Sequence, residues 1–358
     1  MKKILYIDVG LNGHREKYLR ELIKMNEKNN YQIYTLLPNT MKDVDVVQYE
    51  MKSGYNAKRN IITYIKFIKE IKKIAYENNI DVIHFLCGDS LYRFFGLKLR
   101  QLKSKVIITY HHMILKGLKK ISIRRLFKKS DCGIVHTQEL YNKLQENKIY
   151  NSYLVDYPML DFVSIKDVIS VKKQFGLPLN MPIIGVIGGT SEYKGLDFLI
   201  KALNNVRYEC CLFVAGRVIT FDKEYIEGAL KNKKVKLVLA LKELTDEEFA
   251  DAVQASDIIA LPYRLEFDGA SGILIESLFH NKHVIGSSHG SMGSIIKKYH
   301  LGRTFETNSL EDLIDKLEED ILNPYVLSSE AQAYKDKLSP QRFLETHDIL
   351  YDECLKNI

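Results

Sequence analysis

The sequence predicts an α/β protein built from two doubly wound domains, each with a parallel sheet covered by helices on both faces. The chain has 358 residues, more than one domain usually holds. Its strand-like segments are apolar throughout and alternate with helical segments, which is typical of a parallel sheet buried on both faces. This alternation runs through the first half of the chain and starts again at residues 181–189.

The first half opens on a strand and continues with alternating elements. Strands are expected at residues 3–9, 31–37, 81–86, 105–112, 132–137 and 152–158. Helical spacing of apolar residues predicts helices over residues 15–29 and 62–79. This half is expected to form an N-terminal Rossmann-like domain over residues 1–165, which binds the acceptor in the interpretation given below.

The second half repeats the pattern. Strands are expected at residues 181–189, 209–217, 235–241, 256–263 and 283–288. A helix over residues 244–256 begins with a capping box, because Thr245 is followed three residues later by Glu248. Residues 166–338 are therefore assigned to a C-terminal Rossmann-like domain. The last segment, residues 339–358, predicts an amphipathic helix that starts at Ser339 and Pro340 and packs back on the N-terminal domain.

Cysteine content and apolar runs bear on the compartment. The five cysteines form no zinc or redox spacing, and Cys210 and Cys211 fall in an expected strand, so buried thiols in a reducing compartment are predicted. No signal peptide precedes the first strand, and no apolar run reaches the length of a membrane span. We therefore expect a cytoplasmic protein.

Charge is distributed unevenly along the chain. Residues 1–160 contain 29 Lys and Arg against 15 Asp and Glu, whereas residues 161–358 contain 23 Lys and Arg against 30 Asp and Glu. The first half is thus strongly basic and the second acidic, which indicates two units with different partners.

The segment "DGASGILIES", residues 268–277, places small residues at the start of a helix that follows a buried strand. A helix N-terminus offers unpaired N–H groups and partial positive charge, and small residues there let a phosphate approach. Ser271, Gly272 and Ile273 occupy that terminus, and Glu276 can accept hydrogen bonds from a ribose diol. An ordinary loop-to-helix junction has the same pattern, so this motif alone does not establish a phosphate-binding site.

Three further features lie at expected strand ends. Lys194 follows a glycine pair and precedes Gly195 at a helix start, where its ammonium group suits a diphosphate. Gly10 and Gly13 follow the first strand, and His111 and His112 end another. Ligands of doubly wound sheets bind at the carboxyl ends of the strands, so all four features point to one cleft.

With these residues in place, the sequence resembles the retaining glycosyltransferases of family 4, which have the GT-B fold. That family carries two acidic residues with the spacing of Asp268 and Glu276, and the second begins a segment similar to "ESLFHNKHVIG". The segments "YKGLDFLIKAL" and "ELTDEEFADAVQASDIIALPY" also match, and the resemblance covers nearly the whole chain.

The resemblance implies a role for each matching residue. It places Glu276 on the ribose of a nucleotide-sugar donor of UDP or GDP type, and Asp268 on the hydroxyl groups of the donor sugar. Lys194 neutralises the leaving diphosphate, which fixed positive groups stabilise as charge develops on it. The backbone of Ser271, Gly272 and Ile273 binds the diphosphate, Gly13 approaches the donor, and His111 lies close to the transferred sugar. The family works without a metal or a cofactor.

Three departures from the family pattern affect these assignments. Asp268 replaces a glutamate and reaches one methylene less, which bears on the identity of the sugar. No arginine precedes Lys194 where the family has one, and Arg264 or Arg217 is the substitute that we expect. Asn281 stands in place of a helix-ending glycine, a mild change because Asn tolerates the left-handed conformation.

The segment "KGLKKISIRRLFKKS", residues 116–130, combines seven basic residues with five large apolar ones. It is either the solvated face of a helix or a surface that lies on anionic lipid, and the basic character of the whole half favours lipid. Nucleic acid is not expected as a partner, because no recognition motif accompanies the charge. Peripheral attachment to the inner face of the cell membrane follows from the lipid interpretation.

We therefore predict a glycosyltransferase of polysaccharide biosynthesis that moves a sugar, with retention, to a glycan or lipid-linked acceptor. Two alternatives stay open: a nucleotide-sugar epimerase of similar fold, and a weakly active subunit that binds nucleotide sugar within a transferase complex. A dinucleotide oxidoreductase is disfavoured, since no G-x-G-x-x-G follows either opening strand.

Overall fold

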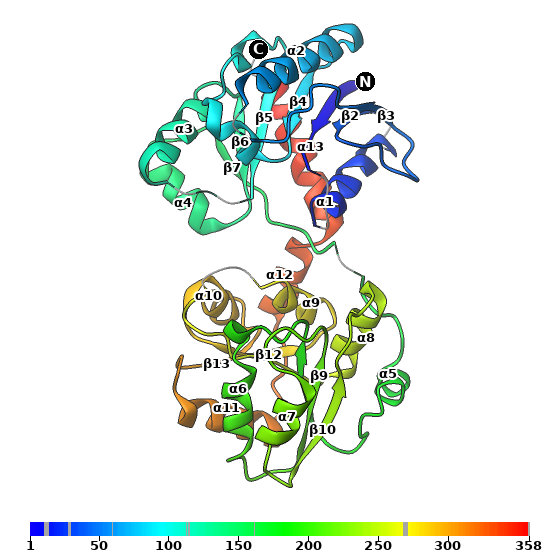
Figure 1. The fold of residues 1–358 in the computed structure, drawn as a ribbon, viewed down its shortest axis with the longest axis vertical. Coiled ribbons are helices and arrows are strands. Elements are labelled where there is room, and N and C mark those ends of the chain that lie inside the picture. Colours follow the sequence, from blue (N-terminus) through cyan, green and yellow to red (C-terminus); the bar gives the residue numbers. More distant parts are fainter. Residues whose placement is uncertain are drawn as a thin grey trace. The chain divides into compact units, whose positions relative to one another are not determined.

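The computed structural model describes residues 1–10, 14–27, 30–58, 60–111, 113, 115–160, 162–267 and 271–356, with the side chains of all of these except His14 and Glu139. The chain divides into two compact units (Figure 1). The first unit comprises Met1–Leu160 and Lys337–Ile358, and the second comprises Asp161–Asp336. The first unit thus ends at Leu160 where the sequence suggested residue 165, and the chain returns to it at Lys337.

The first unit is built on a seven-stranded parallel sheet with the order β3-β2-β1-β4-β5-β6-β7. Its strands are β1 (Lys2–Ile7), β2 (Tyr31–Leu37), β3 (Val47–Glu50), β4 (Val82–Phe85), β5 (Lys105–Tyr110), β6 (Cys132–Val135) and β7 (Ser152–Leu154). Successive side chains point to opposite faces of a strand. Accordingly Leu5 and Ile7 belong to the core cluster on one face, while Ile4 and Tyr6 belong to the cluster on the other.

Helices cover both faces of this sheet. They are α1 (His14–Ile23), α2 (Ile61–Asn78), α3 (Gly117–Phe127), α4 (Gln138–Glu146) and α13 (Pro340–Lys356), with the 3₁₀ turns η1 (Lys24–Glu27), η2 (Gly88–Phe94) and η3 (Leu99–Gln101). The ends of α2 follow from its sequence, because the Asn60 side chain accepts hydrogen bonds from the backbone N–H groups of Ile62 and Thr63, and Asn79 ends the helix in the left-handed conformation.

The final helix, α13, packs in the first unit although the whole second unit precedes it in the chain (Figure 1). The hydroxyl group of Tyr351 donates to that of Tyr6 at 3.2 Å, and His84 Nδ1 lies 2.8 Å from the Tyr351 hydroxyl. Phe343 and Tyr351 are fully buried in the same core cluster as Ile4 and Tyr6. The sheet face that α13 covers would otherwise be apolar and exposed.

The second unit has a six-stranded parallel sheet with the order β10-β9-β8-β11-β12-β13. Its strands are β8 (Ile183–Ile187), β9 (Cys210–Ala215), β10 (Val235–Ala240), β11 (Ile258–Leu261), β12 (His283–Ser287) and β13 (Gly302–Phe305). Its helices are α5 (Val168–Gln174), α6 (Leu196–Leu203), α7 (Lys223–Ala229), α8 (Asp246–Ala255), α9 (Gly272–Phe279), α10 (Gly290–Lys298), α11 (Leu310–Leu322) and α12 (Ser329–Lys337), with the 3₁₀ turn η4 (Glu192–Lys194).

Two local predictions for this unit are confirmed. Helix α8 begins with the predicted capping box, in which the Thr245 hydroxyl accepts from the Glu248 backbone N–H and the Glu248 carboxylate accepts from the Thr245 N–H. Cys210 and Cys211 are free thiols that are fully buried in β9. Along the described ranges, no helix is both long enough and apolar enough to cross a bilayer.

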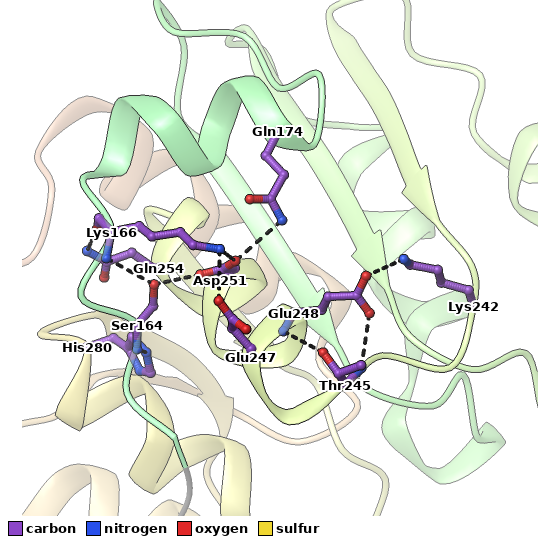
Figure 2. Close-up of polar contacts among 10 residues, drawn as sticks. All are labelled: Ser164, Lys166, Gln174, Lys242, Thr245, Glu247, Glu248, Asp251, Gln254 and His280. Atoms are coloured by element: carbon purple, nitrogen blue, oxygen red, sulfur yellow. Dashed lines mark hydrogen bonds and ion pairs between the residues drawn. The ribbon is translucent and has the colours of Figure 1, made fainter.

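Within the second unit, the segment that leads into α5 is held against α8 by a buried carboxylate (Figure 2). Asp251, fully buried in α8, accepts hydrogen bonds from the Ser164 hydroxyl and the Lys166 ammonium group, both at 2.6 Å. Burial alone would raise the pKa of Asp251, but these hydrogen bonds outweigh it and the pKa lies below its usual value. The Ser164 backbone N–H also donates to His280 Nε2 at 3.0 Å, and His280 Nδ1 donates to the Glu276 carbonyl oxygen.

Candidate functional site

The candidate site of the second unit lies at the carboxyl edge of its sheet. The strand order reverses between β8 and β11, since β9 and β10 lie on one side of β8 and β12 and β13 on the other side of β11. Doubly wound sheets bind ligands at such switch points. The loops that follow β8, β9, β10 and β11 carry the residues described below.

Lys194 is positioned by two glycines that flank it in the chain. Gly188 has φ +101°, and a Cβ atom there would lie 2.8 Å from the Lys194 Nζ atom, so the ammonium group rests on the glycine. Gly195 has φ +68°, and a Cβ atom there would lie 2.1 Å from the Pro262 carbonyl oxygen, which ties the start of α6 to the loop after β11. Close backbone approach thus requires glycine at position 195, and the positive φ angle favours glycine at position 188.

Lys194 and Glu276 interact electrostatically. Burial lowers the pKa of the Lys194 ammonium group, and the negative charge of Glu276 opposes this shift. The Glu276 side chain is 8% exposed, so its charge is poorly screened by water. Lys194 and Glu276 were predicted separately from the sequence, and the structure brings them close enough for their charges to interact.

Helix α9 provides the third part of the site. Ser271 is its N-cap but makes no side-chain capping bond; its hydroxyl lies 3.4 Å from that of Tyr263. The first N–H groups of the helix, including those of Gly272 and Ile273, have no acceptor within the helix. A Cβ atom at Gly272 would lie 3.9 Å from Glu276 Oε1, so this carboxylate leans back toward the helix start.

A cavity of about 270 Å³ opens beside Lys194. Its walls come from the loops after β8, β9 and β10 and from α8, and it is lined by Gly188, Gly189, Ser191, Tyr193, Lys194, Gly216, Arg217, Ile219, Glu243, Leu244 and Phe249. Lys194 and Arg217 were expected at the site from the sequence, whereas Glu243 was not. The position of Glu243 just after an apolar strand was the available signal.

Arg264 occupies different surroundings from those of Lys194. Its guanidinium group forms ion pairs with Asp197 at 2.8 Å and with Glu192 at 3.3 Å, and it lines a second cavity of about 250 Å³. Its backbone N–H donates to the Tyr193 carbonyl oxygen at 2.8 Å, which fastens the loop after β11 to the Lys194 turn. The structure therefore gives this guanidinium group two carboxylate partners of its own, and its predicted role toward a donor stays a prediction.

In the first unit, His111 follows the last residue of β5 and is partly buried. Its Nε2 lies 3.0 Å from the carbonyl oxygen of Leu86, so Nε2 carries the proton and donates. The ring lies 5.1 Å from that of His136, and the Tyr18 ring meets both edge-on. The position at a strand end is as predicted from the sequence.

The loop after β1 carries a buried carboxylate, paired with a cation of α1, that was not predicted from the sequence. Asp8 is 2% exposed, pairs with the Arg15 guanidinium group and accepts from the Gly10 N–H at 3.0 Å. Burial raises the pKa of Asp8, although the charge of Arg15 opposes the shift. An acid directly after an apolar strand was the signal for it. The predicted site residues Gly13 and Asp268, and also His112, lie outside the described residues.

Comparison with known proteins bears on both units. Residues 167–337 match the family model described as glycosyl transferases group 1. An uncharacterized glycosyltransferase of Methanocaldococcus jannaschii is 25% identical over 314 residues, which cover 80% of this chain and 83% of that protein.

Solved structures share the fold of the entire chain. A glycosyltransferase from Rickettsia africae has a TM-score of 0.76 at 19% identity, covering 100% of this chain and 99% of its own. Anabaena HepE in complex with UDP and glucose has a TM-score of 0.67 at 14% identity, covering 99% of this chain and 100% of its own. The predicted pair of parallel-sheet Rossmann-like domains is thereby confirmed. The chain therefore matches the glycosyl transferases group 1 model over residues 167–337 and has the fold of the GT-B glycosyltransferases.

Proposed function

We propose that this protein transfers a sugar, with retention of the anomeric configuration, from a nucleoside diphosphate sugar to a glycan or lipid-linked acceptor. The observation that carries the proposal is the convergence of Lys194, Glu276 and the uncapped start of α9 at the switch point of the second unit. Structures of Anabaena HepE were solved with UDP and with UDP-glucose, which supports a nucleotide-sugar donor.

Each group has a chemical task in this proposal. The buried carboxylate of Glu276 accepts hydrogen bonds from the two ribose hydroxyl groups. Cleavage of the bond between the sugar and the phosphate leaves negative charge on the diphosphate, which the Lys194 ammonium group and the N–H groups of Gly272 and Ile273 stabilise. These groups are held in place before the reaction by the glycine contacts around Lys194. Asp268 is assigned to the hydroxyl groups of the donor sugar.

Calorimetric titration of the full chain with UDP and with GDP tests the donor site. Glu276→Ala should weaken binding of the preferred nucleotide by about 1.5–3 kcal/mol, the size of a lost charge-assisted hydrogen bond. Glu227→Ala, at an exposed position of α7, is the matched control and should leave affinity unchanged. Equal affinity of Glu276→Ala and the unmodified chain would remove Glu276 from the site.

Transfer is tested separately from binding. Incubation with donor alone distinguishes an epimerase, which would rearrange or hydrolyse the donor without an acceptor. Nuclear magnetic resonance of the glycosylated product gives the anomeric configuration, and inversion would contradict the proposed retention. Because the proposed stabilising groups belong to the protein, EDTA should leave the transfer rate unchanged.

The proposed lipid-linked acceptor agrees with the charge of the first unit. Between Asp89 and Asp131 the sequence contains twelve Lys and Arg and no acidic residue. Helix α3 packs inward through Ile123, Leu126 and Phe127, and leaves Leu118 74% and Ile121 47% exposed among its cations. Exposed cations around exposed apolar side chains suit a surface that lies on anionic lipid.

A further inference from the structure

The cavity beside Lys194 contains two oppositely charged side chains that the proposed catalytic groups leave unexplained. Arg217 and Glu243 both line it and both are exposed to solvent. The apolar part of its lining comes from Ile219, Leu244 and Phe249. A diphosphate would be repelled by the Glu243 carboxylate and would gain little from apolar walls. A flat heterocycle can pack against the apolar walls and can form hydrogen bonds with the charged side chains through its polar edges.

Glu243 lies in the short loop between β10 and α8, and the neighbouring charged side chain in that loop is already paired. The neighbouring Lys242 forms an ion pair with Glu248, and Glu248 also completes the capping box with Thr245 (Figure 2). The Lys242 backbone N–H donates to the Ala240 carbonyl oxygen at 3.0 Å, so the loop is held at both ends. In the part of the chain that the structure describes, Glu243 has no hydrogen bond or ion pair through its carboxylate.

Arg217 is held in the adjacent loop by its backbone. The Thr190 N–H donates to the Arg217 carbonyl oxygen at 3.0 Å, and the Thr190 hydroxyl accepts from the Ile219 N–H at 2.9 Å. Thr190 is 1% exposed, so these contacts are sheltered from water. Within the described ranges, the Arg217 guanidinium group has no carboxylate partner, in contrast to that of Arg264.

We infer that this cavity receives the nucleobase of the donor and that Glu243 and Arg217 select guanine over uracil. Guanine presents N1–H and the exocyclic amino group side by side, which matches the two oxygens of a carboxylate. Its O6 and N7 atoms are both acceptors, which match a guanidinium group. Uracil presents a single N3–H between two carbonyl oxygens, and these would face the Glu243 carboxylate unfavourably.

This inference rests on the proposed function, because it assigns the base of the nucleotide that the site binds. Titration calorimetry of the full chain with GDP, UDP and IDP tests it. GDP should bind about tenfold or more tightly than UDP, since one well-placed bidentate contact discriminates between bases by that factor or more. IDP lacks the exocyclic amino group and should also bind about tenfold more weakly than GDP.

Substitution at Glu243 distinguishes a specificity role from a structural one. Glu243→Gln should lower the affinity for GDP about tenfold and raise the affinity for XDP, because xanthine has a carbonyl group where guanine has its amino group and the glutamine amide can donate to it. Glu224→Gln, at an exposed position of α7, is the control and should alter neither affinity. A gain for XDP cannot result from partial unfolding.

Each possible outcome bears on a different claim. Tighter binding of UDP than of GDP by the unmodified chain, or an unchanged GDP-to-XDP ratio in Glu243→Gln, would overturn the guanine assignment and leave the proposed function standing. Absence of binding by every nucleoside diphosphate would overturn the proposed function, and the base assignment with it.

Discussion

A Cβ atom at Gly216 would lie 2.2 Å from the carbonyl oxygen of Gly188. The loops after β8 and β9 therefore touch through their backbones, and Gly216 has φ +138°, which L-residues with side chains rarely adopt. This contact forms one wall of the cavity beside Lys194 and sets the spacing between Lys194 and Arg217.

Gly216→Ala should destabilise the protein by about 2 kcal/mol or more and weaken nucleotide binding, because the added methyl group forces the two loops apart. Gly228→Ala is the control: no atom lies within 4 Å of its added Cβ, it falls within α7, and it should be neutral or stabilising by about 0.5–1 kcal/mol. Urea unfolding measures both changes. Equal stability of the two variants would show that the loops separate freely.

Lys194→Ala should depress turnover by about a hundredfold or more, with a smaller effect on donor binding, because its charge matters most when the diphosphate leaves. Steady-state kinetics with the preferred donor measures both effects. Lys231→Ala removes an equivalent charge from an exposed position of the same unit and should leave turnover and donor binding unchanged. Turnover within threefold of the unmodified chain would show that another cation stabilises the leaving diphosphate, and Arg264 would be tested first.

His111→Ala should abolish transfer and keep nucleotide affinity. The reason is that the proposed nucleotide site is made by residues of the second unit, whereas His111 belongs to the first. His112→Ala should reduce stability more than rate, since the family resemblance assigns the position near the transferred sugar to His111. Kinetics, calorimetry and thermal unfolding of both variants separate these effects. A dispensable His111 beside an essential His112 would contradict the assignment.

Charge reversal on α3 should abolish binding to vesicles that contain anionic lipid. The variant Lys119→Glu, Arg124→Glu, Lys128→Glu alters three exposed cations of this helix and its end. The variant Lys66→Glu, Lys69→Glu, Lys72→Glu changes the net charge equally on exposed positions of α2 and should still bind. Binding of the unmodified chain should fall with salt, because charges are screened over about 10 Å at 0.1 M. Equal sedimentation with neutral and anionic vesicles would contradict the membrane surface.

The first unit should lose stability in mild acid because it buries neutral histidines. Burial, with smaller effects of neighbouring histidines, lowers the pKa of His136 to about 3; burial also lowers that of His347 to about 4 and that of His84 well below its usual value. The unfolded chain therefore binds more protons below about pH 6.5, so stability is complete above that pH and falls as the pH decreases through it. The shifted pKa values of His136 and His347 should each lower the free energy of unfolding by about 2 kcal/mol at pH 5, and His84 should act in the same direction.

Thermal unfolding between pH 7.5 and pH 5 measures this loss. His347→Phe should lower the melting temperature at pH 7.5, since it removes the bond from His347 Nδ1 to the Phe343 carbonyl oxygen, but should make the melting temperature less dependent on pH. An unchanged pH dependence in this variant would show that other groups cause the acid sensitivity.

Local signals in the sequence predicted much of the fold. Apolar runs gave β1, β2, β4 and the central strands of the second unit, because a strand buried on both faces needs apolar side chains throughout. The strand β3 was missed: it lies at the sheet edge and carries the mixed residues Val47–Glu50, which have no such requirement. The predicted helix over residues 15–29 divides into α1 and the turn η1, a boundary that no capping residue announced.

The sequence by itself determined which residues stand at strand ends, because apolar strands, glycine turns and helix starts are local patterns. That information placed Lys194, Glu276 and His111 at the edges of their sheets. Only the tertiary structure decided their partners. In the folded chain, Arg264 forms ion pairs with Asp197 and Glu192. Arg217 and Glu243 line one cavity, and α13 packs against β1. Such pairings join segments far apart in the chain, and they depend on strand order and backbone approach, which no short stretch of sequence encodes.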